Sequence, residues 1–207
     1  MKVNPLFYPY FFAFFIFTLL NTHLCSAQYA YWGVKAGVQG TKISGLSFDS
    51  KMTPGFNIGV FGNFILSEKF ALQHEALYSH RGFEGTTLDS FDVVGTLPYL
   101  DLPWLLHYNI NKVFHIQAGL QPSIYLFYKK AKADSSEFSK YNVNPLELSG
   151  LIGVGAIMRN NILFGIRVNV SFGQTFNTSE FGGRNVALQA YLGYAVNRKI
   201  KGKKKKK

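Results

Sequence analysis

The stretch that decides the fold runs over residues 97–128 and reads LPYLDLPWLLHYNI, then NKV, then FHIQAGLQPSIYLFY. Apolar side chains occupy every second position from Leu100 to Tyr108, and again from Phe114 to Leu120. A period of two residues indicates extended strands, because successive side chains of a strand point to opposite faces. The break at Asn109–Lys112 is short enough for a hairpin turn.

The length of these two strands favours a membrane barrel over a soluble sandwich. The first strand carries five apolar side chains on one face and Asp101 on the other. In lipid, only helices and closed barrels pair every backbone polar group. We therefore expect an all-β fold, an eight-stranded antiparallel up-and-down transmembrane β-barrel preceded by a cleaved signal peptide.

The same alternation recurs along the rest of the chain and predicts six further strands. We expect them at residues 29–39, 55–66, 70–83, 145–158, 162–173 and 185–196. The predicted connections alternate between long and short, beginning with a long one at 40–53 and including another at 84–96. Outer-membrane barrels have short periplasmic turns and longer extracellular loops. The pattern thus predicts the cell outer membrane as the location, with both termini periplasmic.

Composition and charge distribution narrow the class of protein. The 207 residues include 20 Phe, 12 Tyr and 20 Gly, which suits strands and aromatic girdles at a membrane interface. The net charge of +11 comes mostly from the chain ends, since eight of the 22 basic residues lie in 198–207. Residues 28–197 carry 13 basic and 11 acidic side chains, so we expect no nucleic-acid partner.

Three segments are predicted. Residues 1–27 have the features of a signal peptide, with Lys2, an apolar run FFAFFIFTLL at 11–20 and small residues before Gln28. Residues 28–197 form the outer-membrane barrel, and 198–207 form a Lys-rich periplasmic tail. Cys25, the sole cysteine, leaves with the leader; lipidation is the alternative, although Leu24 is large for such a site. The tail is either a solvated end or a segment attracted to anionic head groups.

Two sets of residues follow from strand parity. A closed eight-stranded barrel is just wide enough for side chains to fill it, and buried charges must be paired. The predicted polar network of the lumen comprises Lys35, Glu75, Arg81, Asp101, His107, Glu147 and Arg167. The predicted lipid-facing residues are Trp32, Phe56, Leu102, Trp104, Leu106, Phe164, Ile166, Val168, Leu188 and Leu192.

The same parity argues against catalysis. Ser79 and His80 are adjacent and so point to opposite faces, which works against a Ser–His relay. His107 and His115 can lie near each other inside, where hydrogen bonding is a simpler role than metal ligation. We expect no catalytic, cofactor-binding or metal-binding residues and no cofactor.

The chain resembles the small outer-membrane β-barrel domains of Bacteroidetes, labelled porin-like or PorT-like. The resemblance covers residues 28–197 and rests on GVKAGV at 33–38, PGFNIGVF at 54–61, LQHEALYSHRGF at 72–83, YLDLPWLLHY at 99–108 and FHIQAGLQ at 114–121. It implies an eight-stranded barrel in the outer membrane. Some members of the group are linked to secretion, so the resemblance implies a secretion-linked role as one of several. The family supplies no catalytic motif to transfer.

These expectations favour a structural or interaction role, with the loops as the contact surface and a lumen filled by side chains. The expected partners are outer-membrane lipid, the barrel-assembly machinery and a protein bound through the extracellular loops. The alternatives are a narrow porin-like channel or a small-ligand-binding barrel. A lipocalin-like soluble binder and a lipid-modifying enzyme are weaker candidates, the first because few charges would cover its surface.

Overall fold

The computed structural model describes residues 29–45, 48–86, 92–126, 143–175, 183–196 and 198. These residues form ten β elements. They are β1 (Tyr29–Gly45), β2 (Phe48–Lys51), β3 (Thr53–Ile65), β4 (Phe70–Thr86), β5 (Asp92–Asp101), β6 (Trp104–Asn109), β7 (Phe114–Tyr125), β8 (Leu146–Ile157), β9 (Ile162–Ser171) and β10 (Arg184–Ala195). The predicted signal peptide and most of the predicted tail lie outside the described residues.

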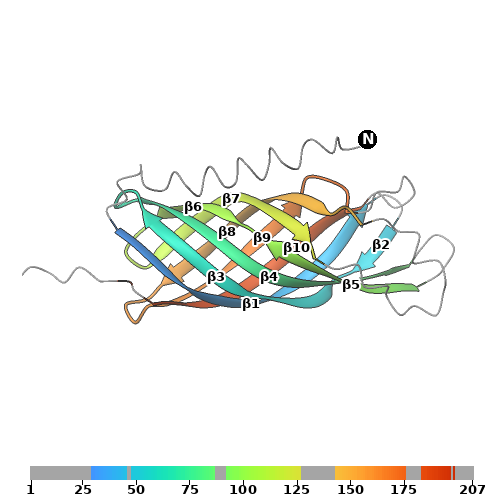
Figure 1. Cartoon of the computed structure of the whole chain (residues 1–207), viewed down its shortest axis with the longest axis horizontal. Helices are drawn as coiled ribbons and strands as arrows, with labels where there is room; N and C mark the ends of the chain where they lie inside the picture. Colours follow the sequence, from blue (N-terminus) through green and yellow to red (C-terminus); the bar gives the residue numbers. More distant parts are fainter. Residues whose placement is uncertain are drawn as a thin grey trace, which may run out of the picture.

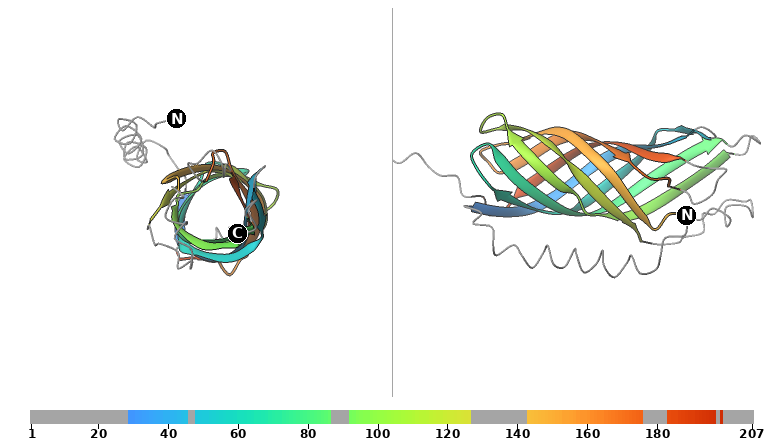
Figure 2. Two further views of the ribbon diagram at one scale, coloured as in Figure 1. Left: turned by 90° about the vertical axis from the view of Figure 1, so that its right-hand side faces the viewer. Right: turned by 90° about the horizontal axis from the view of Figure 1, so that it is seen from above.

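The ten elements make one closed antiparallel barrel of eight strands, because β2 continues into β3 and β5 continues into β6. Each strand pairs with its neighbour in sequence, and β10 pairs with β1 to close the ring. Figure 1 shows the strands tilted around the long axis, and the end-on view in Figure 2 shows the closed ring. The predicted eight-stranded antiparallel barrel is confirmed, and closure pairs the first and last strands, β1 and β10, with each other.

Two prolines inside the predicted strands are accommodated without a change of register. Neither Pro103 nor Pro122 lies at a bulge, because the pairing of β4 with β5 runs into that of β4 with β6 without a shift, and the pairing of β7 with β8 is continuous through Pro122. Each proline still uses its carbonyl: Pro103 accepts a hydrogen bond from Glu75 N at 3.0 Å, and Pro122 accepts one from Leu102 N at 2.9 Å. Each ring removes only one ladder donor, and the first interrupts the strand between β5 and β6.

Two of the connections that the sequence predicts to be long are largely strand. β1 continues to Gly45, which pairs with Phe48 of β2, and β4 continues to Thr86, which pairs with Asp92 of β5. Met52 is an extra residue between β2 and β3, a bulge that shifts the pairing with both β1 and β4 by one position. These polar segments lack apolar alternation, which is why the sequence pattern does not reveal them.

Three short turns lie at one end of the barrel, together with Tyr29 and Ala195; we call this the turn end, and the opposite end the loop end. The turns join β3 to β4, β6 to β7 and β8 to β9, and each is closed by backbone hydrogen bonds between its flanking residues. In the last turn, Asn161 has a φ of 68°. Asn is one of the few residues that adopts this left-handed conformation readily.

The two faces of the sheet differ sharply in chemistry. Polar and charged side chains from all eight strands are buried inside, whereas large apolar side chains cover the outside. Trp32 is 52% exposed and Val38 is 68% exposed, yet Lys35, between them in sequence, is only 3% exposed. Within the described residues, no helix is long and apolar enough to cross a membrane.

Candidate functional site

The interior contains a first group of ions around Glu75, which we call the Glu75 cluster (Glu75, Lys35, Arg167 and Gln73). Lys35 Nζ lies 2.7 Å from Glu75 Oε1, and Arg167 Nη1 lies 2.9 Å from Glu75 Oε2. Gln73 Nε2 donates a further hydrogen bond to Oε1 at 2.6 Å. A single carboxylate from β4 thus ties β1 and β9 together across the lumen, and its side chain is 0% exposed.

A second group of ions, the Arg81 cluster, has the reverse composition (Arg81, Asp101, Glu147, Ser123 and Tyr99). Arg81 Nη2 lies 2.5 Å from Asp101 Oδ1, and Nη1 lies 2.9 Å from Glu147 Oε1. Ser123 accepts a hydrogen bond from Nη2 at 3.0 Å, and the guanidinium carbon lies 4.4 Å from the centre of the Tyr99 ring. Here a single cation from β4 holds carboxylates of β5 and β8.

The inward positions of β4 therefore organise both clusters. Glu75 and Arg81 are six residues apart, so they share the inward face of one strand. The Glu75 cluster has two cations and one anion, and the Arg81 cluster has one cation and two anions. The six charges cancel overall, which is how a low-dielectric interior can hold them.

The structure places six of the seven predicted lumen residues in these two clusters and the seventh, His107, beside His115. The two imidazole rings stack with centroids 4.4 Å apart and an interplanar angle of 9°. Among the described residues, neither Nε2 atom has a hydrogen-bond partner, so the expected hydrogen bonding at these atoms is not found. Parallel stacked rings also do not aim their nitrogens at one common point.

Uncharged partners complete the network and were missing from the predicted site. Arg167 Nε donates to Gln189 Oε1 at 2.5 Å, and Gln189 Nε2 donates to Gln39 Oε1 at 2.9 Å. Tyr191 accepts a hydrogen bond from Gln117 at 2.8 Å, and Lys35 Nζ lies 3.6 Å from the centre of its ring. Their inward parity was readable in the sequence, but a neutral residue gives no sign that it must be paired.

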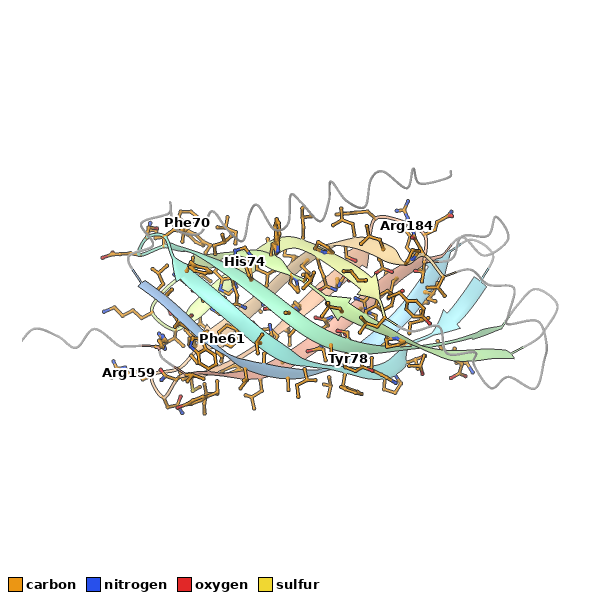
Figure 3. All side chains as sticks on the ribbon, viewed as in Figure 1. Phe61, Phe70, His74, Tyr78, Arg159 and Arg184 are labelled. Atoms are coloured by element: carbon orange, nitrogen blue, oxygen red, sulfur yellow. The ribbon has the colours of Figure 1, made fainter. Side chains whose placement is uncertain are left out.

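At the turn end, the lumen is filled by an apolar group that we call the turn-end plug. It consists of Tyr31, Phe61, Leu163 and Ala195, all buried. The rings of Tyr31 and Phe61 meet edge to face with centroids 6.3 Å apart, and Figure 3 labels Phe61 in this part of the barrel. The Arg198 guanidinium carbon lies 6.0 Å from the centre of the Tyr31 ring. Side chains therefore occupy the lumen between the turn end and the Glu75 cluster.

The remaining candidate for nucleophilic chemistry does not assemble. Ser79 is fully buried inside, whereas His80 lies on the outer surface with its ring stacked 5.2 Å from that of Phe56. The expectation that these neighbours point to opposite faces is correct. The described residues also contain no cluster of three or more His, Cys, Asp or Glu side chains that could hold a metal ion.

The outer surface is an apolar band bounded by charges. The ten predicted lipid-facing residues all lie on this surface, with Leu102 and Trp104 half-buried by their neighbours and the other eight exposed. His74 also faces outward, between the rings of Phe64 and Trp104, each 5.8 Å away. Arg159 and Arg184 lie at opposite ends of the barrel in Figure 3.

The height of this band matches a membrane. Phe70 and His80 mark two aromatic levels on β4, with Tyr108 5.5 Å from the first ring and Phe56 stacked on the second. Ten residues of a strand tilted by about 40° rise about 25 Å, which is the height of the apolar band of an outer-membrane barrel.

Comparisons with known proteins agree with this geometry. The model of the outer membrane protein β-barrel domain family matches residues 25–177. Among solved structures, Neisserial surface protein A superposes with a TM-score of 0.51 at 15% identity, over 81% of this chain and 99% of that one.

Two other outer-membrane barrels superpose with lower scores. OprG from Pseudomonas aeruginosa gives a TM-score of 0.47 at 13% identity, covering 82% of this chain and 95% of that one. Ail of Yersinia pestis gives 0.46 at 14% identity, covering 81% and 99%. The sequence comparison with curated proteins found no match. At these identities the structural likeness concerns the fold alone.

Proposed function

Because the chain belongs to the family of outer membrane protein β-barrel domains, we propose that it is a filled membrane anchor whose loop end forms a contact surface. Membership of the family places the barrel in the outer membrane, with its apolar outer surface in contact with lipid. The observation that carries the proposal is the interior: two buried ion clusters and the turn-end plug occupy the lumen. Side chains that are tied across the barrel leave it suited to anchoring rather than to conduction.

The contact surface is the strand platform at the loop end, built from the paired ends of β1 with β2 and of β4 with β5. β1 continues past Lys42 and β4 continues past Glu84, and each of these is the first charged residue on the outward face of its strand. The platform is polar, and Lys51 and Glu84 form an exposed ion pair across it at 3.2 Å. Figure 1 shows β2 and the ends of β4 and β5 projecting at this end. Paired strands that extend beyond the lipid would offer a contact surface to partners outside the cell.

The test of the filled lumen is electrical. Purified barrel inserted into planar bilayers should give no conductance steps, while heat-modifiable migration on gels shows that the same sample is folded. Glu75→Ala, which removes the anion between Lys35 and Arg167, should remain silent or conduct weakly because the turn-end plug is intact. Regular ohmic steps from the wild-type protein would reject the anchor in favour of the narrow channel.

The test of the contact surface uses photo-crosslinking residues on intact cells. Positions Asp49 and Ser50 on the platform should give discrete protein adducts, and Lys69 in the turn between β3 and β4 is the matched control on the other side of the membrane. Adducts equally frequent at all three positions, or at none, would overturn the interaction role. The resemblance to PorT-like barrels implies a secretion-linked role. If the chain has that role, a deletion strain should export an altered set of proteins.

The proposal includes an orientation with the turn end, both termini and the barrel-assembly machinery on the periplasmic side. The sequence has a single cysteine, Cys25, within the predicted leader. Single cysteines at Ser50 and Lys69 can therefore be labelled without background once the leader is removed. We expect an impermeant thiol reagent to label Ser50→Cys on intact cells and Lys69→Cys only after the outer membrane is opened; the reverse pattern would refute this orientation.

A further inference from the structure

The apolar outer surface has a hollow of about 590 Å³ over β7, β8, β9 and β10, near the turn end. Its walls are formed by Phe114, Val154, Ala156, Phe164, Ile166 and Ala190. Five of the six are exposed on the outer face, so the hollow opens toward lipid. Ala156 is buried among them, and the inward-facing His115 and Tyr191 reach the same hollow from the lumen side. The hollow is a groove in the apolar band. The strands that form it run up to two of the short turns, the one between β6 and β7 and the one between β8 and β9.

The groove exists because small residues lie between large ones. Ala156 pairs with both Phe114 and Phe164, so a short side chain lies between two rings that stand out from the wall. Behind it, Gly155 pairs with Gly165, and the Tyr191 hydroxyl lies against both from inside. A Cβ at either glycine would meet that hydroxyl at 2.6 Å. The wall is therefore a single backbone layer here, with the Tyr191 side chain directly behind it.

The turn end above this groove is basic. Lys112 lies in the turn that connects Ile110 to Phe114, and Arg159 lies in the turn after Met158; both are exposed. Arg198 donates a hydrogen bond to the Met158 carbonyl at 2.8 Å, which brings a third cation to the second turn. The described residues of these two turns include no acid, whereas the turn between β3 and β4 has one of each sign, Glu68 and Lys69.

We propose that this groove and its basic rim bind one anionic phospholipid, with an acyl chain along the groove and the phosphate against Lys112 and Arg159. A flexible methylene chain can follow an irregular apolar groove, and a lipid in the turn-end leaflet holds its phosphate at the level of the turns. Basic residues at a membrane surface favour anionic lipid by about fivefold each. The proposed orientation decides only which leaflet supplies this lipid in the cell: with the turn end in the periplasm, it is the periplasmic leaflet.

The test is preferential quenching of a tryptophan in the groove. The chain has two tryptophans, Trp32 and Trp104, so Trp32→Phe with Trp104→Phe gives a background into which Phe164→Trp places a single probe. The full chain is refolded in vesicles of phosphatidylcholine that contain a small fraction of brominated phosphatidylglycerol or of brominated phosphatidylcholine. We expect the anionic lipid to quench the Phe164→Trp probe several-fold more effectively than the neutral lipid, at low salt.

Two controls isolate the site. A single probe at Phe56→Trp, at the loop end of β3, should show nearly equal quenching by the two lipids. Lys112→Gln with Arg159→Gln should abolish the preference at the groove, and Lys42→Gln with Lys69→Gln, which removes the same charge elsewhere, should leave it intact. Because both leaflets of these vesicles have the same composition, the result does not depend on the orientation in cells or on the anchor role.

A second variant separates the groove from the charges. Ala190→Trp, in the same background without the other probe, fills the groove; native mass spectrometry should then show loss of the retained phosphatidylglycerol, whereas Ala118→Trp, on the outer face of β7 and outside the groove, should keep it. Equal quenching by both lipids at Phe164→Trp would overturn the proposal. So would exclusion of both lipids accompanied by a dimer in cross-linking, which would assign the groove to a second copy of the chain.

Discussion

The Glu75 and Arg81 clusters are mirror images in charge, and the contrast between them shows what holds the interior together. In the first, one carboxylate satisfies two cations; in the second, one guanidinium satisfies two carboxylates. The central ion of each comes from β4, and the outer ions come from other strands. Removing a central ion leaves two like charges facing each other, whereas removing an outer ion leaves a neutral pair. Central and outer positions should therefore respond differently to substitution.

The largest loss is expected for Glu75→Gln. The substitution leaves Lys35 and Arg167 in a buried site without an anion, and breaking a buried ion pair in this way costs about 3–5 kcal/mol. Urea titration of the refolded barrel in lipid vesicles, followed by tryptophan fluorescence, measures the free energy of unfolding. A loss below about 1 kcal/mol would mean that the interior is hydrated enough to solvate both cations.

Arg81→Met should cost a similar amount near neutral pH but respond differently to acid. The variant leaves Asp101 and Glu147 without their cation, and buried carboxylates without a partner can take up protons, whereas arginine cannot lose its own. The folded state of this variant then binds more protons than its unfolded state, so its stability rises as the pH falls.

Acid should therefore reduce the deficit of Arg81→Met relative to wild type but not that of Glu75→Gln, because Lys35 can become neutral there only by losing a proton, and acid opposes that loss. The check is to repeat the urea titrations at two pH values, one neutral and one mildly acidic. Parallel pH dependence of the two variants would contradict the difference in sign between the clusters.

Outer ions should matter less. Lys35→Met leaves Glu75 paired with Arg167, and Glu147→Gln leaves Arg81 paired with Asp101, so each variant retains a neutral pair. We expect losses of about 1 kcal/mol, the net value of a single hydrogen-bonded contact. If either variant proved as damaging as the loss of its central ion, the clusters would have to be treated as indivisible units.

The smallest expected quantity is the coupling between the clusters. Among the described residues, no ion pair or hydrogen bond links a member of one cluster to a member of the other. Independent sites add to within about 0.5 kcal/mol, so the double variant Glu75→Gln with Arg81→Met should show the sum of the single effects. A coupling well above that limit would show that their opposite net charges attract across the lumen.

Strand parity in the sequence was sufficient to predict which residues face inward. A side-chain period of two residues leaves each position only two choices, and an apolar face such as that of Phe164, Ile166 and Val168 decides between them for the whole strand. The same rule correctly predicts that Ser79 and His80 point to opposite faces. The sequence alone is enough to predict the face on which a side chain lies, because that face depends only on local backbone geometry.

The partners across the lumen were beyond such reasoning. Glu75 and Arg167 are 92 positions apart in the chain, and they meet only because the tilt and stagger of all the strands bring β4 opposite β9 at that height. The strand platform at the loop end was missed for a different reason. Outside the lipid, both faces of a strand contact water, so residues 40–45 and 48–51 show no apolar alternation although they pair as strands.

The central claim, that the apolar face of every strand contacts acyl chains while the charges are enclosed, is tested most directly with the native tryptophans. Trp32 and Trp104 both lie on the outer face, and the chain has no others. In vesicles with brominated acyl chains, the account predicts strong quenching of their fluorescence together with weak quenching by aqueous acrylamide. Efficient acrylamide quenching with no effect of the brominated lipids would contradict it.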